Sequence, residues 1–301
     1  MIRRESTRCG IVALIGAPNS GKSTLINRVL GSKVSIVTHK VQTTRTRVVG
    51  VLTKDNNQII FVDTPGIFTP NRRLEKAMVS AAWVGAADAD QVILLIDSER
   101  GLGEETQLII KGIKDTKKKV YAALNKIDLI PRAQLLELAA NLNLSKCFED
   151  IFMISALKGD GVNALLLTLG GCLPEGPWLY PEDHLSDMND RLFAAEITRE
   201  KLFLTLHQEL PYSLTVETES WEELRDRSIK INQVIFVERK GHKGIVLGKG
   251  GQQVKRVGAQ SRKDLEQHFD RRIHLFLFVK VRENWREDPE RYRKMGLEFG
   301  N

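Results

Sequence analysis

Short apolar runs separated by helical patterns fill residues 10–173 of the chain. The runs have the length of buried strands, and they lie at 11–15, 47–53, 58–62, 91–97, 119–124 and 151–154. Helical spacing of apolar residues follows most of them, at 24–30, 104–114, 132–142 and 162–172. This alternation predicts a doubly wound α/β domain with ligands at the carboxyl ends of its strands. Only the polar turn Asp55-Asn56-Asn57 separates the second and third runs, so we expect a hairpin with one antiparallel edge strand there.

The pattern changes after residue 173. Residues 174–190 contain three prolines and little periodicity, and we interpret them as an interdomain linker. The elements predicted beyond it are a helix at 191–209, strands at 212–219 and 231–238, a glycine turn, two short helices, and a strand at 273–282. This order predicts a separate α+β domain. The predicted domains are therefore 1–173 and 191–301, joined by the linker.

Composition narrows the class of protein. The chain has 301 residues, of which 42% are hydrophobic, so it can bury two cores of ordinary size. Its three cysteines show no metal-ligand spacing, which is typical of a reduced, cytosolic protein. No run approaches the 18 apolar residues of a membrane span. The net charge of +7 is compatible with a polyanionic partner.

The loop after the first predicted strand carries a phosphate-binding pattern. Gly16-Ala17-Pro18-Asn19-Ser20-Gly21-Lys22-Ser23 fits G-x-x-x-x-G-K-[ST], and Thr24 continues into the predicted helix. The glycines let successive backbone N–H groups face one anion, and the N-terminus of the helix adds partial positive charge. Lys22 can reach the β- and γ-phosphates, and the Ser23 hydroxyl can bind Mg²⁺.

Two further segments predict contacts with Mg²⁺ and the γ-phosphate. Asp63-Thr64-Pro65-Gly66 follows the third run, where Asp63 can hold Mg²⁺ and the Gly66 N–H can reach the γ-phosphate. Between the first helix and the second strand lies Gln42-Thr43-Thr44-Arg45. We expect Thr44 to bind Mg²⁺ in the first switch loop, with Thr43 as the alternative. The competing interpretation is a polar, solvated loop that binds no ligand.

A base-recognition element follows the fifth run. In Asn125-Lys126-Ile127-Asp128, the Asp128 carboxylate can accept hydrogen bonds from guanine N1–H and N2–H₂, which adenine does not offer. Asn125 would tie the loop together, and the stem of Lys126 would cover the base. After the sixth run, Ser155-Ala156-Leu157 would place a backbone N–H at guanine O6. Four elements in this order predict a GTP-binding domain that uses Mg²⁺.

The second domain carries a glycine loop in basic surroundings. Gly248-Lys249-Gly250-Gly251 precedes a helical stretch with Lys255 and Arg256, and it fits the GXXG loop that grips single-stranded RNA in KH domains. From Arg239 to Arg282 there are twelve Lys and Arg residues against three acidic residues. The basic residues could also form a solvated surface without a ligand. The order of the elements, however, matches a type II KH fold and favours RNA binding.

These segments together resemble the Era family, bacterial Ras-like GTPases with an appended KH domain. The resemblance covers nearly the whole chain and rests on the five nucleotide segments above and on Glu209-Leu210-Pro211-Tyr212-Ser213. It implies a GTP-hydrolysing switch in small ribosomal subunit maturation that binds near the 3′ end of 16S ribosomal RNA. It also implies a cytoplasmic protein with loose inner-membrane association. We expect GTP, GDP and RNA as partners and a monomeric state.

Position 67 bears on the mechanism. Ras-like enzymes with a catalytic glutamine carry it after the D-x-x-G glycine, whereas this chain has Ile67 there. We therefore expect catalysis from Lys22, Thr44 and Mg²⁺, with slow basal turnover. Asn19 occupies the position where related potassium-activated GTPases hold K⁺, although simple loop geometry explains an asparagine there equally well. An assembly factor that binds RNA and holds GTP as a structural ligand, with negligible turnover, is the alternative.

Overall fold

The computed structural model describes residues 7–114, 116 and 118–299, so the extreme ends of the two predicted domains lie outside it. The chain forms two compact units. The first comprises Met1–Ser35, Thr44–Asp187 and Met295–Asn301, and the second comprises Ile36–Thr43 and Met188–Lys294. This division differs from the predicted domain boundaries. In particular, residues 36–43 of the first switch loop belong by their contacts to the second unit.

A six-stranded sheet forms the centre of the first unit. Its strands are β1 (Arg8–Ile15), β2 (Val48–Lys54), β3 (Asn57–Asp63), β4 (Gln91–Asp97), β5 (Lys119–Asn125) and β6 (Ile151–Met153). Their order is β2-β3-β1-β4-β5-β6, and every neighbouring pair is parallel except β2 with β3. The predicted hairpin and antiparallel edge are thus confirmed. Because β1 lies between β3 and β4, the loops after β1 and β3 leave the same edge of the sheet side by side.

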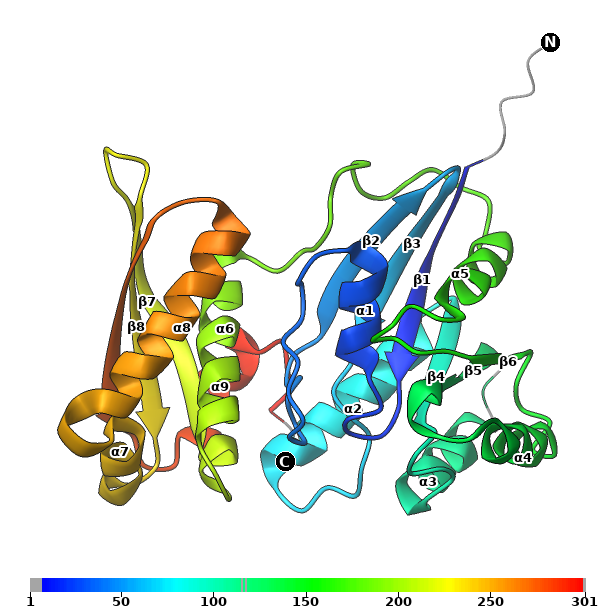
Figure 1. Cartoon of the computed structure of the whole chain (residues 1–301), viewed down its shortest axis with the longest axis horizontal. Helices are drawn as coiled ribbons and strands as arrows, with labels where there is room; N and C mark the ends of the chain where they lie inside the picture. The colour runs from blue at the N-terminus through cyan, green and yellow to red at the C-terminus, as the bar shows by residue number, and fades with distance from the viewer. Residues whose placement is uncertain (1–6, 115, 117, 300–301) are drawn as a thin grey trace, which may run out of the picture. The chain divides into compact units, whose positions relative to one another are not determined.

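Helices cover both faces of this sheet (Figure 1). α1 (Lys22–Leu30) and α5 (Val162–Gly171) pack on one face, against side chains such as Leu14 and Phe61. On the other face lie α2 (Arg73–Asp88), α3 (Glu104–Ile113) and α4 (Arg132–Asn143). The strands are buried on both sides, which is why they appear in the sequence as continuous apolar runs.

Part of the predicted linker is attached to the first unit. The Gln58 side chain donates to the Tyr180 carbonyl at 2.8 Å and accepts from the Leu179 N–H at 2.9 Å. Farther along, the Ser186 hydroxyl donates to the Val49 carbonyl at 2.8 Å, and the Val51 N–H donates to the Leu185 carbonyl at 2.9 Å. The bonds to Val49 and Val51 give hydrogen-bond partners to backbone groups on the open edge of β2. Residues 174–187 are therefore a covering segment of the first unit and not a free tether.

The second unit is an α+β structure with a three-stranded sheet. Its elements are α6 (Asp190–Thr205), β7 (Leu214–Glu223), β8 (Ile229–Val237), α7 (Lys240–Leu247), α8 (Gln252–Phe269) and β9 (Ile273–Val281). β7 and β8 are antiparallel, and β8 and β9 are parallel. The helices bury one face of the sheet, and Figure 1 shows α6 and α8 side by side upon it. The predicted fold class, a doubly wound domain followed by a KH-like α+β domain, is confirmed.

Several boundaries differ from the prediction. α8 has 18 residues and is not short; Gly258 lies within it, and a Cβ built there would lie 3.4 Å from Leu277 Cδ1. β7 begins at Leu214 because Leu210–Ser213 forms a 3-10 turn. Two of the described α-helices have no counterpart among the predicted ranges: α2, and the short α9 (Pro289–Lys294) beside the buried Trp285. No helix in the part of the chain that the structure describes is long and apolar enough to cross a bilayer.

Candidate nucleotide and nucleic-acid sites

The loop between β1 and α1 has the backbone of a phosphate cradle. Gly16 and Gly21 have φ angles of +154° and +100°, in a region that residues with a Cβ rarely adopt. A Cβ on Gly16 would lie 2.5 Å from the Leu95 carbonyl oxygen, and one on Gly21 would lie 2.1 Å from Asn125 Nδ2. Both positions therefore require glycine. Asn19, between them, also has a positive φ, of 66°.

Lys22, at the first position of α1, is buried beneath this loop. Its ammonium donates to the carbonyls of Gly16, at 3.0 Å, and Ala17, at 3.1 Å. Burial lowers the pKa of Lys22 from 10.5 to about 8, although Asp63 and Glu105 act in the opposite direction. A bound phosphate would supply the negative charge that this buried cation lacks.

The hydroxyl and carboxylate oxygens predicted for Mg²⁺ converge. Ser23 Oγ donates to Asp63 Oδ2 at 2.6 Å, and it lies 2.9 Å from Thr44 Oγ1. Asp63 is fully buried, and its Oδ1 has no hydrogen-bond partner among the described residues. Burial raises the pKa of Asp63, while Lys22 and the hydroxyl donors oppose this rise. A buried carboxylate oxygen with an open coordination position, beside two hydroxyls, fits a hard cation such as Mg²⁺.

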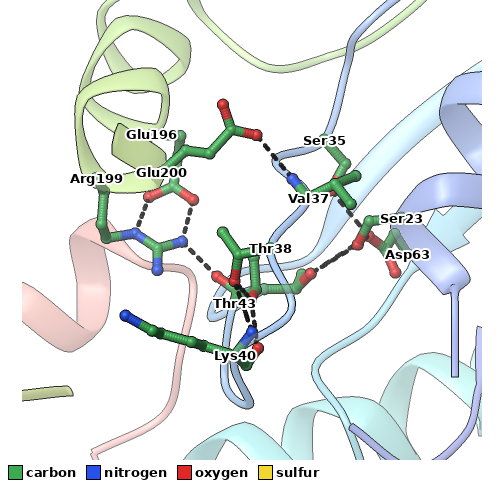
Figure 2. Close-up of polar contacts among 11 residues, drawn as sticks. Ser23, Ser35, Val37, Thr38, Lys40, Thr43, Asp63, Glu196, Arg199 and Glu200 are labelled. Carbon is green, nitrogen blue, oxygen red and sulfur yellow. Dashed lines mark hydrogen bonds and ion pairs between the residues drawn. The ribbon is translucent and has the colours of Figure 1, made fainter. Parts of the chain in front are cut away.

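The two candidate threonines differ in their hydrogen bonds, and Figure 2 shows those of Thr43. Thr43 Oγ1 lies 2.6 Å from Thr38 Oγ1 and donates to the Lys40 carbonyl at 2.7 Å, so it bonds within its own loop. Thr44 is the one beside Ser23, which favours it as the switch ligand. Sequence reasoning missed Ser35, whose hydroxyl donates to Asp63 Oδ2 at 2.9 Å. No motif marks Ser35, because only the folding of the loop brings it to the carboxylate.

The segment after Asp63 turns back onto β1 and the phosphate loop. The Thr64 hydroxyl donates to the Leu14 carbonyl at 2.7 Å, so this side chain anchors the segment to the sheet. A Cβ on Gly66 would lie 2.9 Å from the Pro18 ring, which leaves room only for glycine beside the phosphate loop. Ile67 is completely buried in the core between the sheet and α2. The position of the catalytic glutamine in other Ras-like enzymes is thus a core position in this chain.

Asn125, at the end of β5, connects three loops. Its Nδ2 donates to the Ser20 carbonyl at 2.8 Å, and its Oδ1 accepts from the Ala156 N–H at 2.9 Å. Asn125 was predicted to tie its own loop together; in the structure it joins that loop to the phosphate loop and to the loop after β6. In the segment Ser155-Ala156-Leu157, predicted to place a backbone N–H at guanine O6, the Ala156 N–H is directed at Asn125.

The predicted base-reading carboxylate lies beside a hydroxyl and a cation. A hydrogen bond from the Ser155 hydroxyl lowers the pKa of Asp128, and Lys158 Nζ, 3.5 Å from Asp128 Oδ2, acts in the same direction. Asp128 is therefore held as an anion that can accept from guanine. The Lys126 ammonium lies 2.5 Å from Asp97 Oδ2 at the end of β4. Asp97, which sequence reasoning missed, thereby fixes the direction of the Lys126 stem.

The GXXG loop of the second unit connects α7 to α8 with an open backbone. Gly248, Gly250 and Gly251 have φ angles of 70°, 60° and 76°. No atom lies within 4 Å of a Cβ built on Gly250 or Gly251, whereas one on Gly248 would lie 2.7 Å from Gln253 Cβ. Gly248 thus serves the turn itself, and the next two glycines leave space for a strand of nucleic acid. The side chains of Lys249, Lys255 and Arg256 are exposed beside them.

Comparison with known proteins identifies both types of domain. Residues 11–126 match the family model described as 50S ribosome-binding GTPase, and residues 209–286 match the KH domain model. The chain is 58% identical to GTPase Era of Sinorhizobium medicae, over 97% of this chain and 94% of that protein. The chain belongs to the Era family of GTPases. GTPase Era of Agrobacterium fabrum is also 58% identical, over 97% of this chain and 92% of that protein.

Two solved Era structures share the whole architecture. One is a point variant from Aquifex aeolicus bound to GDP and AlF₄⁻, with 38% identity, a TM-score of 0.92 and coverage of 96% of this chain and 99% of that one. The other is Era in complex with MgGDPNP and nucleotides 1506–1542 of 16S ribosomal RNA. It has 39% identity, the same TM-score and the same coverage. As a member of this family, the chain is a GTPase that hydrolyses GTP to GDP and phosphate.

Proposed function

We propose that this GTPase is a molecular switch that binds RNA and acts in maturation of the small ribosomal subunit. The observation that carries the proposal is the presence of both sites on one chain. A complete set of nucleotide loops stands at the sheet edge of the first unit, and an open, basic GXXG loop stands on the second. The Era structure with MgGDPNP and 16S ribosomal RNA supports a similar pair of ligands for this chain.

Mg²⁺ belongs to the proposal, with Ser23, Thr44 and Asp63 as the residues that would hold it. The open Oδ1 of the buried Asp63 supports this assignment. When bound, Mg²⁺ would neutralise charge on the β- and γ-phosphates. The chain's own part is to hold the three oxygens together and to place the Lys22 ammonium under the phosphate loop.

Position 67 holds an isoleucine whose side chain is buried in the core, so no side chain at this position can orient the attacking water. Lys22 and backbone N–H groups of the phosphate loop remain to stabilise the charge that develops on the phosphates. A monovalent cation at Asn19 would add to this stabilisation, so K⁺ is part of the proposal. Turnover without a partner should be slow.

The alternative is an assembly factor that binds RNA and keeps GTP as a structural ligand. A multiple-turnover phosphate-release assay separates the two functions. We expect turnover that is faster in K⁺ than in Na⁺ at matched ionic strength, with Asn19→Ala removing the difference. RNA should increase the rate further. A single turnover per protein molecule in every condition would support the structural-ligand function instead.

The proposed setting is the cytoplasm, with loose association to the inner membrane and a monomeric state. Resemblance to the Era family supports the membrane association. Fractionation of cells that express the tagged chain tests it, with the nucleotide-binding variant Lys22→Ala in parallel.

A further inference from the structure

The segment between Ser35 and Thr44 is held by α6. We call residues 36–43 the switch segment. Ile36, at its start, is buried in one apolar cluster with Phe193, Ala194 and Ile197 of α6. The segment thus belongs to the core of the second unit, although in sequence it lies inside the nucleotide-binding half of the chain.

Two adjacent side chains of α6 fasten the two ends of this segment (Figure 2). Glu200 Oε1 accepts from the Val37 N–H at 2.9 Å, and Arg199 Nη2 donates to the Thr43 carbonyl at 2.5 Å. Arg199 is itself fixed, because Glu196 accepts from its Nε at 2.8 Å and the Phe203 ring lies 5.1 Å from its guanidinium. Arg199 and Glu200 are both buried, so water competes little for these charge-assisted bonds.

The middle of the segment contacts the end of the same helix. The Lys40 ammonium donates to the carbonyls of Phe203 and Leu206. α6 ends at Thr205, so its last carbonyls lack partners within the helix and carry its partial negative charge. A cation from the switch segment thus caps the C-terminus of α6.

The ends of the switch segment adjoin the nucleotide site by direct chain connection. Ser35 precedes it and Thr44 follows it, and both hydroxyls lie beside Asp63 within the first unit. The Thr43 carbonyl and the Thr44 nitrogen belong to one planar peptide group. By holding that carbonyl, Arg199 restricts the orientation from which the Thr44 side chain projects.

We propose that Arg199 and Glu200 of α6 are positioning residues of the GTP site. They act through the switch segment, and they favour the placement of Thr44 that GTP with Mg²⁺ requires. GDP makes no use of a γ-phosphate contact, so its affinity depends little on them. A partner that displaces α6 therefore lowers the affinity of the protein for GTP. By linkage, bound GTP lowers the affinity for that partner by the same factor.

An ion-pair chain extends this arrangement to the helix after the GXXG loop. The Lys201 ammonium lies 3.2 Å from Glu200 Oε2 and 2.5 Å from Asp264 Oδ2 on α8. A shift of α8 therefore acts on the same glutamate that holds Val37. The link consists of contiguous charged contacts within the second unit.

The experiment measures nucleotide affinity in full-length variants, with and without Mg²⁺. Fluorescent GDP and a fluorescent non-hydrolysable GTP analogue are titrated into Arg199→Ala, Glu200→Ala, Glu200→Gln and Lys40→Ala. Arg191→Ala is the matched control, since it removes an exposed arginine from the same helix. Hydrogen exchange of residues 36–46 in the nucleotide-free proteins supplies a readout independent of nucleotide.

We expect the alanine variants at 199 and 200 to bind the GTP analogue about tenfold more weakly in Mg²⁺. Their affinity for GDP in EDTA should stay within about twofold of the wild type, and residues 36–46 should exchange faster. Glu200→Gln keeps an oxygen acceptor for Val37 and should behave like the wild type, as should Arg191→Ala. If Arg199→Ala unfolds, Lys40→Ala and the two Glu200 variants decide the question. Unchanged affinity for the GTP analogue, or equal losses for GDP in EDTA, would overturn the proposal.

Discussion

Asn125 Nδ2 lies 2.8 Å from the carbonyl oxygen of Ser20, and this bond joins the base-reading loop to the phosphate loop. The other end of the same amide holds the Ala156 N–H. Asn125 is 2% exposed, so water cannot replace either partner. One side chain therefore sets the relative placement of the loops that contact the two ends of the nucleotide.

Asn125→Ala should weaken GDP binding and lower the free energy of unfolding. Two buried backbone groups lose their partner, and each such loss costs about 1–3 kcal/mol. Titration with a fluorescent GDP and denaturant unfolding measure the two effects. Asn141→Ala, at an exposed position of α4, is the control and should change neither. Wild-type GDP affinity in Asn125→Ala would show that the three loops are placed by other contacts.

The loops that meet at this edge of the sheet could be predicted from the sequence because they depend on local residue order. The strand ends, the glycine positions and the motif residues Lys22, Asp63 and Asn125 follow from apolar runs and from the loops that end them. Ser35 and Asp97 were missed because they contribute through contacts distant in sequence, to Asp63 and Lys126. The length of α8 was missed because Gly258 and the polar face of the helix weaken the pattern.

Asp128→Asn should remove the preference for guanine. The Asp128 carboxylate is the acceptor placed for both guanine donors, and sites built on such bonds reject analogues by roughly 10⁴–10⁵. An amide offers one acceptor and one donor, which suits xanthine better than guanine. Competition of labelled GTP by GTP, ATP and XTP measures the change. Retention of wild-type selectivity for GTP would remove Asp128 from the base-reading role.

GDP binding above pH 8 should be accompanied by proton uptake. Burial holds the pKa of Lys22 at about 8 in the free protein, so most of this side chain is neutral at pH 9. A bound phosphate favours the charged form and raises the pKa towards its usual value, so binding at pH 9 takes up close to one proton. At pH 7 Lys22 is already charged and contributes little uptake. Calorimetry in EDTA, in two buffers of different ionisation enthalpy, measures the proton count. Equal binding enthalpies in both buffers at pH 9 would contradict this assignment.

The switch segment shows where sequence reasoning stops. Its residues have no periodic pattern, and a solvated loop remains an alternative interpretation of the polar Gln42-Thr43-Thr44-Arg45. The partners that hold it, Arg199 and Glu200, lie more than 150 residues away in a helix whose pattern indicates only an apolar face. Arg199 and Glu200 stand out from other charged residues only by their burial. Burial is a property of the folded chain, so the sequence pattern does not reveal it.

The central claim is that this GTPase binds RNA through its GXXG loop. It predicts that a mutation in this loop removes RNA binding and leaves GTP binding unchanged. In Gly250→Asp/Gly251→Asp, two carboxylates occupy the open space beside the loop and repel phosphate. Lys249→Ala introduces no backbone strain and should weaken RNA binding, with a salt slope shallower by about 0.7. Gly171→Asp/Gly176→Asp is the control, because it adds the same charge at positions with no atom within 4 Å of a built Cβ.

The most direct measurement is fluorescence anisotropy of a labelled single-stranded RNA, across a salt series, beside a GTP titration of the same proteins. The wild type and the Gly171→Asp/Gly176→Asp control should bind the RNA, and more tightly with a GTP analogue than with GDP. Gly250→Asp/Gly251→Asp should lose RNA binding and keep its affinity for GTP. If this variant binds the RNA as tightly as the wild type, the GXXG loop is only a turn and the account is contradicted.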